Sequence, residues 1–93
     1  MPTAHADPSD SQVNMYLAEL QRRGVSYSTP DAVVFLGQAS CNALHSGNSV
    51  QAVINQIQQS FTGHDTGIIL GSAVTVFCSD ELEALQAYIN NNS

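Results

Sequence analysis

Basic residues are almost missing from this chain. Its 93 residues include no lysine and only two arginines, Arg22 and Arg23, against eight acidic residues, which gives a formal net charge of −6. Two adjacent cations cannot neutralise a row of phosphates, so nucleic acid is a poor partner. An anionic membrane surface is disfavoured for the same reason.

Long apolar segments are missing as well. No run of residues approaches the roughly 20 apolar positions that a membrane-spanning helix needs, so no transmembrane segment is expected. An apolar signal-peptide core is also absent, but Ala4-His5-Ala6 has the small-x-small form of a signal peptidase site. We therefore expect residues 1–8 to be a flexible leader that holds the remnant of a signal peptide, with cleavage after Ala6.

Recognisable catalytic motifs are absent too. Gly63, Gly67 and Gly71 lack the spacing and the preceding strand of a phosphate-binding loop. The sequence has neither a nucleophile elbow nor a His-Glu-x-x-His helix. These absences favour a protein that is not an enzyme and that uses no cofactor. The alternative is an uncharacterised enzyme with His45 in a cleft.

Two small groups of reactive side chains have simpler structural explanations. The acidic residues Asp80, Glu81 and Glu83 lie at an expected helix start, where carboxylates stabilise the helix. Ser40 and His45 share one helix, but no third group is evident to orient the imidazole as in a catalytic triad. Neither group therefore predicts catalysis.

What the chain does contain indicates one small domain. Hydrophobic residues make up 43% of it, which is typical of a globular protein. Charged residues make up only 11%, so amide and hydroxyl side chains must cover the surface. Such an exterior suits an extracellular or cell-wall setting. A domain this short has a marginal core, so a covalent cross-link would matter.

Apolar spacing and capping residues predict an all-α fold. The first helix is expected from residue 9 or 10 to Gly24, and the second from Pro30 to Gly47, with Thr29 as its cap. Tyr16 belongs to the apolar face of the first helix and is expected at the edge of the core. The expected inner stripe of the second helix is Val34, Gly37, Cys41 and Leu44, flanked by Val33 and Leu36.

The second half of the chain predicts three more helical segments. Ser49 is expected to cap an amphipathic third helix. A fourth helix, with Asp65 as its cap, is expected over 66–78, although the density of β-branched residues across 74–77 also suits a strand. Asp80 with Glu83 forms the pattern of a capping box for a last helix. We leave open whether that helix continues the fourth.

Together these segments predict a single helical domain over residues 9–89, with a frayed tail at 90–93. The fold class is all-α, a small orthogonal or up-down bundle of four to five helices with one intramolecular disulfide.

Cys41 and Cys78 are the cysteines expected to form that disulfide. Each lies on an apolar stripe, in the C-terminal part of the second and fourth helices. If these helices run parallel, both thiols lie at the same end of the bundle. Gly37 and Gly71, on the same stripes, would let the two helices approach closely.

A zinc site is the alternative use of the same thiols. Cys41 and His45 are four residues apart on one helical face, and Cys78 with His64 would complete a tetrahedral set. Against it, the chain has no close Cys-x-x-Cys pair, and export disfavours free thiols. The simpler expectation is that no metal is bound, with His45 near a helix end and His64 in a loop.

Three sequence segments resemble the domain of unknown function 732 family, small exported proteins found mainly in mycobacteria. The first is Tyr16-Leu17-x-x-Leu20-x-x-x-Gly24. The second opens with Pro30-Asp31-Ala32 and ends with Cys41-x-x-Leu44-x-x-Gly47. The third is Gly71-Ser72-Ala73-Val74-x-x-Phe77-Cys78.

This resemblance covers about residues 12–79 and implies an exported helical domain with Cys41 bonded to Cys78. It supports signal-peptide cleavage after Ala6. The family usually ends soon after its second cysteine, so residues 79–93 are an extension. The resemblance supplies no catalytic residues.

The expectation for function is a secreted or cell-envelope domain, a monomer, that acts by binding a protein or a cell-wall component. The alternative is a carrier of a small apolar or lipid-like ligand, because Val33 to Leu36 and Ile68 to Leu70 provide much apolar surface.

Overall fold

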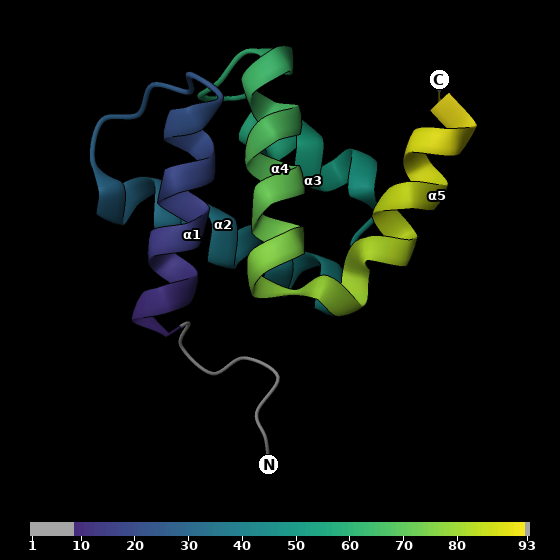
Figure 1. The fold of residues 1–93 in the computed structure, drawn as a ribbon. Helices are drawn as coiled ribbons and strands as arrows, with labels where there is room; N and C mark the ends of the chain where they lie inside the picture. Colours follow the sequence, from purple (N-terminus) through teal and green to yellow (C-terminus); the bar gives the residue numbers. More distant parts are fainter. Residues whose placement is uncertain (1–8, 93) are drawn as a thin grey trace.

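The computed structural model describes residues 9–92, which form five α-helices and one short 3-10 helix. Figure 1 shows α1 and α4 side by side and antiparallel, while α2 crosses behind them and α5 leads away from α4. The all-helical prediction is confirmed, although α2 crosses α4 rather than running parallel to it. The elements are α1 (Asp10–Arg22), α2 (Pro30–His45), α3 (Val50–Ile57), α4 (Gly63–Phe77), η1 (Ser79–Glu81) and α5 (Leu82–Asn92).

Hydroxyl side chains cap the first four helices. Ser9, Thr29 and Ser49 accept backbone N–H groups at the starts of α1, α2 and α3. Thr29 and Ser49 were predicted, and at α1 the structure selects Ser9 from the two candidates at positions 9 and 10. The prediction for α4 is wrong by one turn. Thr62 is its cap, because the Thr62 hydroxyl accepts the backbone N–H of Asp65 at 3.2 Å. Asp65 therefore lies in the first turn, where its charge suits the helix dipole.

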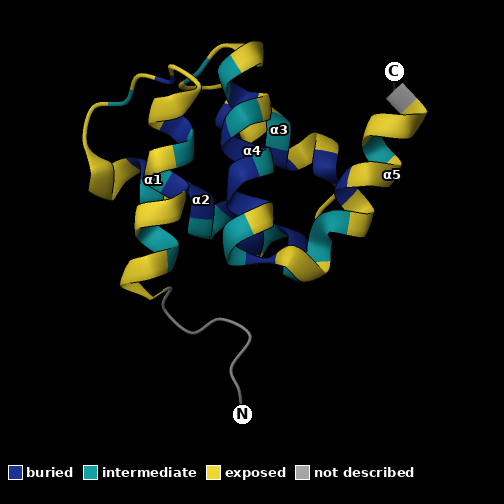
Figure 2. Ribbon diagram, in the orientation of Figure 1, coloured by how far each residue is buried: buried dark blue, intermediate teal, exposed yellow. Residues whose placement is uncertain are grey.

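The core is built around the side chain of Tyr16 on α1, which is fully buried rather than at the core edge. Its hydroxyl donates a hydrogen bond of 2.8 Å to the carbonyl of Val33 on α2. Its ring lies 4.8 Å, centroid to centroid, from that of Phe77 on α4. Figure 2 shows the buried residues gathered along α4 and on the faces of its neighbours. One aromatic side chain thus joins three helices.

Gly37 is the position where α2 approaches its neighbours most tightly. A Cβ atom there would lie 2.9 Å from the Tyr16 ring and 3.1 Å from Phe77. The close approach was predicted, but it is to a side chain of α1 as well as to α4. Gly71 has no such role, because a Cβ there would meet nothing within 4 Å. The inner stripe is also rotated, since Val33 is buried whereas Val34 is only half-buried.

The chain breaks between α4 and α5 at Cys78 and continues through η1. The predicted capping box of Asp80 and Glu83 is not the arrangement found, since η1 has no side-chain cap and Asp80 lies within it. The helical alternative at 74–77 is confirmed over the strand. The last helix continues to Asn92, where the sequence predicted fraying from Asn90.

The expected leader and the cleavage site after Ala6 lie outside the described residues. Within residues 9–92, no helix is both long and apolar enough to cross a membrane.

Candidate functional site

The predicted disulfide is present between Cys41 of α2 and Cys78 at the end of α4, with Cα atoms 5.9 Å apart. Both cysteines are buried. Because both thiols are bonded to each other, the alternative zinc set of Cys41, His45, His64 and Cys78 cannot form in this structure.

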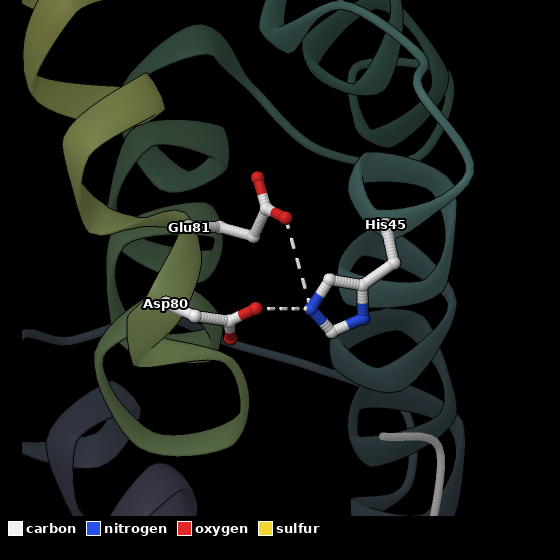
Figure 3. Close-up of side chains that lie close together, drawn as sticks. All are labelled: His45, Asp80 and Glu81. Carbon is white, nitrogen blue, oxygen red and sulfur yellow. Dashed lines mark hydrogen bonds and ion pairs between the residues drawn. The ribbon is translucent and has the colours of Figure 1, made fainter. Parts of the chain in front are cut away.

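The disulfide brings together three polar side chains that are distant in sequence. His45 lies one helical turn after Cys41, and Asp80 and Glu81 follow Cys78 in η1. The His45 Nε2 atom lies 2.9 Å from Asp80 Oδ2 and 3.7 Å from Glu81 Oε2. Figure 3 shows both carboxylates pointing at this one nitrogen. We call these three residues the histidine–carboxylate cluster.

The members of this cluster differ in exposure. The side chains of His45 and Glu81 are 15% and 20% exposed, whereas that of Asp80 is 69% exposed. The cluster is therefore walled on one side by the protein and open on the other. Such an arrangement can hold a proton between the imidazole and a carboxylate, or it can bind a cation from solution.

Sequence reasoning missed this cluster because it assigned its members locally. His45 was placed at a helix end, and Asp80 and Glu81 at a helix start. Once Cys41 and Cys78 are paired, the positions of His45 and Asp80, four and two residues further on, bring them together. His64, a member of the alternative zinc set, lies exposed in the first turn of α4 rather than in a loop, and it does not join the cluster.

Ser40 is not positioned as a nucleophile. It is buried, and its hydroxyl donates a hydrogen bond of 2.8 Å to the carbonyl of Leu36 in its own helix. The hydroxyl proton of Ser40 is thus donated to a backbone carbonyl of α2.

The two arginines also have a local role. Arg22 and Arg23 both contact the carboxylate of Glu19, each at 2.7 Å. Hydrogen bonds from Arg22 and then Arg23 lower the pKa of Glu19 below its usual value. These two cations are therefore already paired with a carboxylate of α1.

A separate surface feature is a hollow of about 580 Å³ between the α1–α2 loop, the start of α2 and the α3–α4 loop. Three aromatic side chains line it, from Tyr27, Phe35 and Phe61, and we call it the aromatic groove. Phe35 is 71% exposed, which is unusual for so large an apolar side chain. Asp65 is the charged residue of its lining, which otherwise consists of Ser26, Ser28, Ala32, Val33, Leu36, Ser60 and Thr62.

A second hollow of about 520 Å³ lies between α1, α4 and α5. Gly67 and Gly71 contribute to its lining, with Met15 and Ile89 among the apolar residues around them. Met15 and Ile89 are 60% and 46% exposed. Because α5 contributes Leu82, Leu85, Gln86 and Ile89 to this lining, the hollow depends on the last helix.

Comparison with protein families gives one finding. Residues 8–80 match the family described as "Protein of unknown function (DUF732)". The match ends at Asp80, so α5 lies beyond it. Neither the curated proteins nor the solved structures contain a match to this chain.

Proposed function

Because the chain belongs to the DUF732 family of proteins of unknown function, we propose from its own surfaces that it is a non-catalytic binding domain that works outside the cytoplasm. The observation that carries the proposal is the aromatic groove. A small domain with few aromatic residues leaves Phe35 exposed beside Tyr27 and Phe61. An exposed aromatic side chain beside two half-buried ones at one hollow is typical of a recognition surface.

The lining of the groove indicates what it binds. Its walls are aromatic and aliphatic, and the charge that it contributes is the carboxylate of Asp65. The whole chain adds a net charge of −6, which attracts cations over a longer range. The occupant that fits is an apolar segment of an exported or cell-wall protein that carries a neighbouring positive charge. The apolar part would cover Phe35, and the cation would approach Asp65 and the aromatic faces.

Two further observations support the proposed location and the proposed lack of catalysis. A disulfide that staples a small domain is typical of proteins that fold in an oxidising compartment. Within the described residues, the hydroxyl of Ser40, which shares α2 with His45, donates a hydrogen bond to the carbonyl of Leu36 in its own helix. The Ser40 hydroxyl is therefore not held as an activated nucleophile of the triad type.

Titration of the full chain with two blocked peptides tests the groove. One peptide is acetyl-Leu-Phe-Lys-amide, and the other has Glu in place of Lys. We expect the Lys peptide to shift backbone amide resonances of residues 26–36 and 60–65, and the Glu peptide to bind more weakly.

Variants separate specific from general apolar binding. Phe35→Ala should abolish these shifts, whereas Met15→Ala, which removes a comparably exposed side chain at the other hollow, should keep them. Asp65→Asn should remove the preference for Lys over Glu. Shifts of equal size in the Phe35→Ala protein would contradict the proposal, and so would the absence of shifts at millimolar peptide.

A carrier of a small apolar ligand is the second candidate. The volume of the aromatic groove, about 580 Å³, lies within the range of small-molecule sites, about 300–1,000 Å³. Lipid extraction and mass spectrometry of protein purified from its native host test this idea. A co-purified lipid that is lost in Phe35→Ala would support it, and a lipid-free protein would not.

A further inference from the structure

We propose that the histidine–carboxylate cluster is a binding site for a divalent transition metal of the zinc type. The proposal does not depend on the aromatic groove. It rests on His45, Asp80 and Glu81, whose ligand atoms all lie within 4.8 Å of one another.

The first argument is the arrangement of acceptors. A proton on His45 Nε2 can be donated to Asp80 Oδ2 at 2.9 Å, but Glu81 Oε2 at 3.7 Å is beyond hydrogen-bond reach of that nitrogen. A metal ion can serve one nitrogen and two oxygens at once. Zinc ligands at about 2.0–2.2 Å from the ion lie roughly 3.4 Å apart in a tetrahedral site. The two nitrogen–oxygen distances of 2.9 Å and 3.7 Å lie on either side of this spacing, and every pair of ligand atoms lies within 4.8 Å, so side-chain rotation can bring the three atoms around one ion.

The second argument is charge. Two carboxylates face one imidazole, so even a protonated His45 leaves a negative charge unbalanced in the cluster. The arginines of the described chain contact Glu19 on α1 instead. A divalent cation supplies the missing positive charge. The nitrogen ligand of the cluster, His45 Nε2, favours zinc-type ions over Mg²⁺ and Ca²⁺.

The third argument is preorganisation. The Cys41–Cys78 bridge fixes α2 against the start of η1, and His45 and Asp80 lie within one turn of its two ends. The imidazole and the Glu81 carboxylate are mostly buried, which limits their rotamers before any ion arrives. Exposure at Asp80 leaves a path for entry and room for a water molecule or another ligand in the fourth position.

Isothermal titration of the oxidised full chain with Zn²⁺ tests the site. Every protein in the series carries His5→Gln, because His5 lies outside the described residues and its imidazole could bind zinc independently. We expect His45→Gln to weaken zinc binding by at least about tenfold. Glu81→Gln should weaken it too, without removing the buried imidazole.

The matched controls are a histidine and a glutamate that lie outside the cluster. His64→Gln and Glu83→Gln should leave zinc affinity unchanged, because both side chains are exposed and lie outside the cluster. Zinc should also shift the ring resonances of His45, and raise the melting temperature of the parent protein but not of Glu81→Gln.

Three results would overturn the proposal. The first is equal zinc affinity in the parent and in both Glu81→Gln and His45→Gln proteins, with the variants folded by circular dichroism. The second is an equal loss in the control variants. The third is tight Mg²⁺ binding that is indifferent to His45, which would reveal only general attraction to acidic groups.

Discussion

At the scale of single residues, Gly37 is where added volume costs most. Gly37→Ala places a Cβ atom 2.9 Å from the Tyr16 ring, which is itself fully buried and cannot move aside. We expect the free energy of unfolding to fall by about 1–3 kcal/mol. Gly71→Ala is the matched control, because it adds the same atom into open space. It should stabilise α4 by about 0.5–1 kcal/mol. Urea unfolding measures both, and a Gly37→Ala protein as stable as Gly71→Ala would contradict the packing.

Tyr16 also makes stability depend on pH. Burial, with a smaller contribution from Tyr27, raises the pKa of the Tyr16 phenol above its ordinary value of 10.0. Below pH 10 both folded and unfolded chains keep the proton, so stability is unaffected. Above it the unfolded chain loses the proton while the folded chain keeps it, so the free energy of unfolding falls as pH rises.

Tyr16→Phe tests this pH dependence. The variant loses the hydrogen bond to Val33 and should be about 1 kcal/mol less stable at pH 8. Its stability should then fall less between pH 8 and pH 11 than that of the parent, as measured by urea unfolding at both values. The described residues contain no free cysteine, so thiol-started disulfide exchange at high pH does not disturb the comparison of the two proteins. An equally steep decline in Tyr16→Phe would locate the effect elsewhere.

At the scale of elements, caps that contact only their own helix were predictable from sequence. Contacts that depend on a second element were not. Thr29 and Ser49 were identified from sequence, and Ser9 was one of two candidates, because a cap contacts only its own helix. Thr62 and Asp65 could both cap, and the choice depends on how the first turn of α4 meets the fold. Asp80 was expected to cap, but His45, 35 residues away, takes its carboxylate. That contact joins α2 to η1 beside the Cys41–Cys78 bridge.

The last helix offers a test of whether α5 belongs to the cooperative core. Leu85 is 8% exposed, whereas Ile89, one turn later, is 46% exposed. Leu85→Ala should lower the free energy of unfolding by about 2–3 kcal/mol, near the low end for a buried leucine. Ile89→Ala should change it by less than about 1 kcal/mol. Thermal unfolding of both variants measures these changes. Equally small changes in the two variants would mean that α5 packs only loosely against the core.

At the scale of the whole molecule, the sequence pattern predicted the class of the fold but not the candidate site. Helical spacing and the two cysteines were sufficient for an all-helical, stapled domain. The histidine–carboxylate cluster depends on three-dimensional closure of the chain across the Cys41–Cys78 bridge. The aromatic groove similarly joins two loops that are about 30 residues apart in sequence. Neither follows from periodicity, because periodicity describes one element at a time.

The disulfide is therefore expected to control both stability and the cluster. The bridged cysteines are 37 residues apart, and closing such a loop contributes about 4 kcal/mol in the chain-entropy model. A domain of this size has a total stability of about 5–10 kcal/mol. The Cys41→Ala/Cys78→Ala protein should therefore be barely folded at temperatures where the parent protein is folded.

Two measurements check this expectation. Thermal unfolding with and without excess reductant should show a large fall in the melting temperature of the parent, and no effect of reductant on the double variant. The ring resonances of His45 should also move toward those of a free imidazole when the bridge is broken, because Asp80 and Glu81 are no longer held beside it. An unchanged melting temperature in reductant would mean that helix packing alone holds the fold. Unchanged His45 resonances would mean that α2 and η1 stay together without the bridge.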